Sequence, residues 1–182
     1  ETVNIEMLEI AQAAWRKKIN APLNSSVGRL FDAASAILGL TEKASFEGQG
    51  PMHLEALAEG RTGSAVPLPI ADSVSQACLQ IDWEPLIKHM LNSQVSAKQR
   101  AADWHESLAT AISEIAKQAR DRHAIKHVGL SGGVFQNRLL AERALTLLEK
   151  QGFICHFPEK VPINDGGLCV GQVTEYLFQL KP

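Results

Sequence analysis

The sequence predicts a helix-rich α/β fold, because strand-like and helix-like segments alternate in the last third of the chain. There Val128–Leu130 and Phe153–Phe157 have the pattern of strands, 137–150 lies between them as a helix, and Asp165 starts a terminal helix. This β-α-β-loop-α order is typical of a parallel-sheet unit. Residues 1–122 are mostly helical, so we expect too few strands for a complete doubly wound domain.

The mostly helical region, 1–122, is expected to hold five helices. The N-cap residues Asn4 and Ser25 or Ser26 begin the first two. The expected helices are 4–18, 26–38, 48–59, 86–91 and 97–121. Between the third and fourth, Gly60–Pro69 is a Gly/Pro-rich loop with one short strand, and Cys78–Trp83 is a second strand.

The composition is that of an ordinary soluble protein. The chain has 182 residues, of which 45% are hydrophobic and 21% charged, which suffices for one core with a helical annex. A net charge of −2 without a Lys/Arg cluster gives no general attraction to nucleic acid or to membranes. The three cysteines share no C-x-x-C spacing, so we expect a reduced, cytoplasmic setting. Because the chain starts at Glu1 inside a helical pattern, we expect a piece of something longer.

Two glycine pairs are the most informative feature. Gly132-Gly133 follows a predicted strand and precedes a helix, and Gly166-Gly167 precedes the last helix. Glycine has no Cβ, so its amide, together with a helix N-terminus, can approach a phosphate closely. The first pair fits neither a Walker loop nor a G-x-G-x-x-G fingerprint, and a plain tight turn is its commoner use.

Four other polar residues have both a structural and a functional interpretation. Asp165 is an N-cap of the last helix or a ligand for a cation that bridges phosphate oxygens. Asp32 is a solvated helical carboxylate or a hydroxyl-binding group that points into a cleft. His123 and His127 have metal-ligand spacing, but they straddle a helix end and a strand start, which favours solvated surface histidines over zinc ligands.

Six motifs, taken in order, resemble one family. They are Ser25–Ala33, Phe46–Gln49, Ile81–Trp83, Trp104-His105, Leu130–Asn137 and Asn164–Gly167. Together they are similar to the C-terminal part of the HypF family of hydrogenase-maturation carbamoyltransferases. The resemblance implies the C-terminal lobe of an actin-like ATPase (ribonuclease H-like) domain with a helical insertion. That domain would be incomplete here: residues 1–182 would be its C-terminal part, with 123–182 as a nucleotide-facing β-α-β-α unit.

The resemblance also implies a reaction. A HypF converts carbamoyl phosphate and ATP into carbamoyl-adenylate. It then passes the carbamoyl group to the C-terminal cysteine of a HypE-like acceptor protein, for synthesis of the cyanide ligand of [NiFe]-hydrogenase. A divalent metal (Mg, Zn or Fe) takes part in the intact enzyme. No catalytic residue in this chain follows from the resemblance.

Site residues follow by position within the motifs. The resemblance assigns Gly132 and Gly133 to the nucleotide phosphates with Asn137 close by, Asp32 and Gly28 to the nucleotide sugar, and Asp165 to the metal. The histidine pair that completes the family's metal site belongs to an upstream lobe, and nothing in these residues supplies it. We therefore expect the isolated chain to lack full activity. Two alternatives remain: a lobe of a tRNA threonylcarbamoyl-transferase, and a non-catalytic module that binds a partner.

Overall fold

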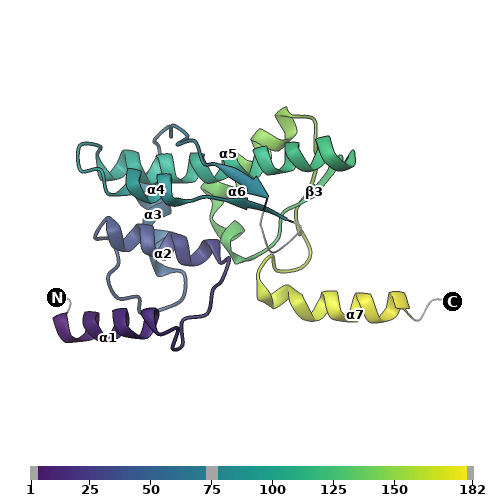
Figure 1. Ribbon diagram of the computed structural model, residues 1–182. Coiled ribbons are helices and arrows are strands. Elements are labelled where there is room, and N and C mark those ends of the chain that lie inside the picture. Colours follow the sequence, from purple (N-terminus) through teal and green to yellow (C-terminus); the bar gives the residue numbers. More distant parts are fainter. Residues whose placement is uncertain (1–3, 73–77, 180–182) are drawn as a thin grey trace.

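The helices expected in the first two thirds are all present in the computed structural model, which describes residues 4–72 and 78–179 (Figure 1). They are α1 (Ile5–Arg16), α2 (Val27–Ile37), α3 (Gln49–Ala58), α4 (Glu84–Met90) and α5 (Ala97–His123). Side-chain caps begin the first two as predicted: Asn4 Oδ1 accepts from Glu6 N, and Ser26 Oγ accepts from Arg29 N. Local sequence is therefore enough to set where these two helices begin.

The long helix α5 is the centre of the core, with α3, α4 and α6 (Arg138–Lys150) packed along it (Figure 1). Trp104 of α5 is fully buried, and its ring meets the edge of Phe31 from α2 with centroids 5.8 Å apart. Burial of one large apolar side chain contributes about 1.5–3 kcal/mol. The other large, fully buried apolar side chains are Leu54, Leu86, Met90, Leu140 and Leu148.

An antiparallel hairpin lies beside this core. Its strands are β1 (Ile70–Asp72) and β2 (Leu79–Ile81), with Ile70 opposite Ile81. The strand expected at Cys78–Trp83 is thus confirmed, while the other strand begins just after the Gly60–Pro69 loop rather than inside it. Arg122 donates to Asp72 Oδ1 over 2.6 Å, which ties the hairpin to the last turn of α5.

The last third forms the predicted parallel unit. Strands β3 (His127–Gly129) and β4 (Ile154–His156) pair in parallel, and α6 lies between them in the sequence. Two short 3-10 turns, η1 (Gly133–Gln136) and η2 (Asp165–Gly167), precede α6 and α7 (Leu168–Gln179). Within β3 only Val128 packs against the core. His127 and Gly129 are exposed, and only Leu130 is buried.

The helices α1 and α7 extend from the body, and neither contains a buried residue (Figure 1). Their apolar side chains are exposed. They are Ile5, Met7, Leu8, Ile10 and Trp15 on α1, and Leu168, Val170, Val173, Tyr176, Leu177 and Phe178 on α7. Within the described residues, no helix combines the length and hydropathy that crossing a bilayer requires.

Candidate carbamoyl-nucleotide cleft

The two glycine-rich segments lie side by side, as the sequence predicts. Gly132 N donates to Ile163 O over 2.8 Å. A Cβ built on Gly133 would lie 3.7 Å from Cβ of Asn164. The turn after β3 and the turn before α7 therefore form one edge of the molecule, although the helix α6 and the strand β4 separate them in the chain.

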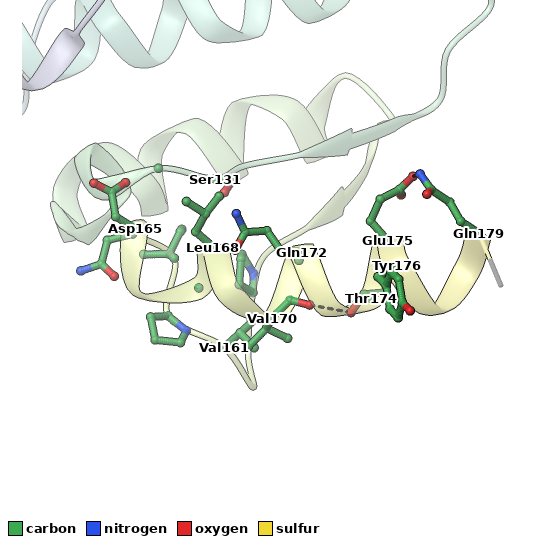
Figure 2. A pocket seen from close by; sticks show the side chains of 17 residues that line it. Ser131, Val161, Asp165, Leu168, Val170, Gln172, Thr174, Glu175, Tyr176 and Gln179 are labelled. Atoms are coloured by element: carbon green, nitrogen blue, oxygen red, sulfur yellow. Dashed lines mark hydrogen bonds between the residues drawn. The ribbon is translucent and has the colours of Figure 1, made fainter.

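A hollow of about 960 Å³ opens at this edge and runs along α7. Figure 2 shows Ser131 and Asp165 at one end of the hollow, with Tyr176 and Gln179 towards the other. Gly132 also lines it, whereas Gly133 and Asn137 do not. The hollow thus unites Gly132 with Asp165, two of the residues that the family resemblance assigns to the site.

The fold requires glycine at some positions of the two pairs but not at all of them. Gly132 has φ +110° and ψ 153°, a conformation that is almost restricted to glycine. A Cβ on Gly167 would lie only 2.3 Å from Pro162 O, so its glycine is sterically required. Gly133 differs, because a Cβ there would make only ordinary contacts at 3.7 Å and beyond. The tight-turn interpretation explains Gly132 and Gly167 but leaves Gly133 unexplained.

Asp165 does not cap the last helix, so that expectation is wrong. Asn164 caps the 3-10 turn η2 that leads into α7, since its Oδ1 accepts from Gly166 N over 3.1 Å. The Asp165 side chain is exposed and lines the hollow. Among residues 4–72 and 78–179, no three His, Cys, Asp or Glu side chains converge on a point that would hold a metal. The described residues therefore do not fit a complete metal site, to which Asp165 would contribute a single carboxylate.

The N-terminus of α6 is occupied by groups of the protein itself. The turn η1 separates Gly132 from α6, and the first amides of the helix already have partners. Glu55 of α3 accepts from Arg138 N at 2.7 Å and from Leu139 N at 3.2 Å. Asn137 Oδ1 accepts from Leu140 N at 2.9 Å. The protein thus supplies its own carboxylate at this helix end. Sequence reasoning missed Glu55, which lies more than 80 residues upstream and has no local signal.

Asn137 lies behind the turn rather than in the hollow. It is only 7% exposed, and besides capping α6 its Nδ2 meets His105 Nε2 at 2.9 Å. His123 and His127, which have metal-ligand spacing in the sequence, lie on different elements. His127 stacks on His156 across β3 and β4, with ring centroids 5.2 Å apart. His123 ends α5. The surface interpretation of His127 is confirmed by its exposure, whereas its partner His156 was not foreseen.

Asp32 lines a different, smaller hollow of about 380 Å³. Its carboxylate lies 3.1 Å from the Arg29 guanidinium, and Phe46, Glu47 and Gly48 form the opposite wall. The two hollows share no lining residue. The helix α2, which carries Asp32, packs against η1, the turn that follows Gly132. Gly28, in the first turn of α2, lines neither.

Residues 2–172 match the family described as "Carbamoyltransferase, Kae1-like Domain, second subdomain". The chain belongs to the HypF carbamoyltransferase family. The helix-rich α/β architecture agrees with this assignment. In a crystal structure of full-length HypF in the phosphate- and nucleotide-bound form, a similar region has a TM-score of 0.89 at 30% identity, covering 99% of this chain and 24% of that one.

Relatives support the same family. The chain is 39% identical to a carbamoyltransferase HypF of Synechocystis, over 87% of this chain and 20% of the relative. It is 38% identical to that of Rhodobacter capsulatus, over 95% of this chain and 22% of the relative. A tRNA N6-adenosine threonylcarbamoyltransferase of Polaromonas naphthalenivorans is 22% identical over 96% of this chain. The chain thus spans about a fifth of the HypF relatives, and the preference for HypF over the tRNA-modifying family is confirmed.

Proposed function

We propose that this chain forms one side of the cleft in which a HypF handles carbamoyl phosphate, ATP and carbamoyl-adenylate. The carbamoyl group would then pass to the C-terminal cysteine of a HypE-like acceptor, for synthesis of the hydrogenase cyanide ligand. The observation that carries the proposal is the hollow shared by Gly132 and Asp165, which come from distant parts of the sequence. A similar chain, solved as a phosphate- and nucleotide-bound HypF, supports it.

The phosphate end of the ligand would meet the turn at Gly132 and Gly133. Gly133 adjoins Gly132 without lining the hollow itself, and neither its backbone conformation nor its neighbours require glycine there. A missing side chain that the fold does not need leaves space beside the turn for a ligand atom. The 123–182 segment would therefore be the nucleotide-facing unit.

The nucleoside end would meet the smaller hollow. Asp32 borders it, and a carboxylate there can accept hydrogen bonds from both sugar hydroxyls. Gly28 lies one turn earlier on α2, the helix that packs against η1. Because α2 packs against η1, a nucleotide that reaches from one hollow to the other would pass this contact.

Asp165 would supply one carboxylate ligand to a divalent metal, either Mg²⁺, Zn²⁺ or iron. One carboxylate binds such an ion weakly, so the remaining ligands would have to come from residues outside the described part of this chain. The acidic side chain stands at the same end of the hollow as Ser131, beside the turn proposed to face the phosphates (Figure 2).

The test is the substitution Asp165→Ala in a full-length HypF that carries this sequence. Carbamoyl transfer to the HypE-like cysteine should be abolished, while carbamoyl-adenylate formation should remain largely intact. Asp121→Ala is the matched control, because that carboxylate is exposed at the end of α5, away from the hollow. Transfer at the wild-type rate in Asp165→Ala would refute the role of Asp165.

A non-catalytic module that binds a partner is the second candidate. The exposed apolar faces of α1 and α7 favour it, since uncovered faces of this kind mark contact surfaces. Titration of the full-length protein with ATP and Mg²⁺ separates the two proposals. Saturable binding that Gly133→Ala weakens supports the cleft, whereas absence of binding favours the module.

A further inference from the structure

A chain of buried polar contacts lies directly behind the turn that carries Gly132 and Gly133. His105 of α5 is 4% exposed and packs edge-on against the Phe31 ring, with centroids 5.3 Å apart. Its Nδ1 lies 2.7 Å from Ala101 O, and its Nε2 lies 2.9 Å from Asn137 Nδ2. Such an enclosed imidazole is not explained by apolar packing alone, because both ring nitrogens have partners.

These partners determine which nitrogen carries the proton. A carbonyl oxygen only accepts, so Nδ1 of His105 must donate to Ala101. Leu140 N donates to Asn137 Oδ1, which orients the Asn137 amide so that its NH₂ group faces His105. Nε2 must therefore accept. The imidazole is neutral in the Nδ1–H form, since a proton on Nε2 would face another donor.

Backbone hydrogen bonds link Asn137 to the turn. Its backbone N donates to Val134 O at the end of η1, and Phe135 N donates to Gly132 O at the start. The far side of the turn is held by the bond from Gly132 N to Ile163 O. A displaced Asn137 would loosen the first turn of α6 and the 3-10 turn together.

We infer that His105 is a positioning residue: as a neutral hydrogen-bond acceptor it fixes Asn137, and through it the turn proposed to face the nucleotide phosphates. The functional part of this inference rests on the proposed function. Burial lowers the pKa of His105, which favours the neutral form that the geometry requires. The hydrogen bond to Ala101 O and, to a lesser extent, the charge of Glu55 on α3 raise this pKa without outweighing burial, while α2 presents the uncharged Phe31 and α6 the uncharged Asn137.

The experiment compares two substitutions in a full-length HypF that carries this sequence. His105→Leu keeps the bulk and removes the acceptor. His105→Gln places a carbonyl oxygen where Nε2 lies and keeps it. We expect amide hydrogen exchange of residues 131–141, measured without ligand by mass spectrometry, to become roughly tenfold faster in His105→Leu. His105→Gln should restore exchange to within about threefold of wild type. His53→Leu, an exposed histidine on α3, is the control.

The same variants are then titrated with ATP. His105→Leu should weaken binding roughly tenfold and His105→Gln far less. Exchange that is unchanged in His105→Leu, or equally fast in both variants, overturns the inference. Fast exchange in His105→Leu, restored in His105→Gln, supports it even if the wild type binds no ATP, in which case the proposed function fails instead. If His105→Leu does not fold, Asn137→Ser decides, because serine keeps the cap but cannot reach His105. Faster exchange of the turn then supports the inference, and wild-type exchange overturns it.

Discussion

At the scale of single residues, adjacent glycines in one turn have different tasks. Gly132 has a positive φ and a donor bond to Ile163 O, so the fold itself requires it. Gly133 meets no steric or conformational requirement. A diglycine is therefore better interpreted one residue at a time than as a motif, because only the residue without a structural reason points to a ligand.

This difference predicts opposite results for two alanine substitutions. Gly132→Ala should lower the free energy of unfolding by about 1–3 kcal/mol, since alanine is strained at that φ. Gly133→Ala should change it by less than about 1 kcal/mol but weaken nucleotide binding. Urea unfolding and calorimetric titration of the full-length protein measure the two effects. A Gly133→Ala variant with normal affinity would leave the turn without a ligand role.

His105 predicts a pH dependence of stability. Burial lowers its pKa below the ordinary value of 6.5, so the unfolded chain takes up the proton first as the pH falls. Stability is therefore complete above pH 6.5 and declines below it, by at most about 1.4 kcal/mol per pH unit from this group. Urea unfolding from pH 7.5 to 5.5 should show a shallower decline in His105→Gln than in wild type. Equal slopes of stability against pH in the two proteins would contradict the lowered pKa of His105.

At the scale of elements, α3 and α6 are coupled at a helix end. Glu55 of α3 accepts from two backbone amides of α6, where a negative charge also interacts favourably with the helix dipole. This contact explains why the helix after the diglycine offers no free amides to a phosphate. The sequence places Asn137 at the start of this helix, but nothing in it indicates the Glu55 carboxylate that completes the cap.

Glu55→Gln should therefore cost about 1 kcal/mol of stability, because it keeps an acceptor and removes the charge. Glu59→Gln is the matched control one turn later on the same side of α3. Its carboxylate pairs with the Arg138 side chain at 3.1 Å in an exposed position, and an exposed pair contributes little. Chemical unfolding of both variants measures the difference. Equal losses of unfolding free energy would show that the Glu55 contact stabilises the protein no more than the exposed ion pair does.

At the scale of the whole molecule, one helix organises the fold. The buried apolar residues of α2, α3, α4 and α6 form one cluster with those of α5, and Trp104 of α5 is fully buried in it. The hollows lie at the margins of this core.

Trp104→Ala should lower the free energy of unfolding by about 3–5 kcal/mol, since it removes a fully buried aromatic side chain and leaves a cavity. Trp83→Ala should cost under about 1 kcal/mol, because that side chain is 48% exposed. Thermal and urea unfolding give both values. Similar losses in the two variants would mean that α5 is not the centre of the core.

Local residue patterns are sufficient to predict the helices and the parallel unit. These depend on the 3.6-residue period and on caps such as Asn4, Ser26 and Asn137, whose bonds reach only a few residues along the chain. The tertiary structure alone decided that Glu55 occupies the end of α6 and that Asp32 borders a separate hollow. Such contacts join residues dozens of positions apart. They follow from how helices pack, and no local pattern of residues records that.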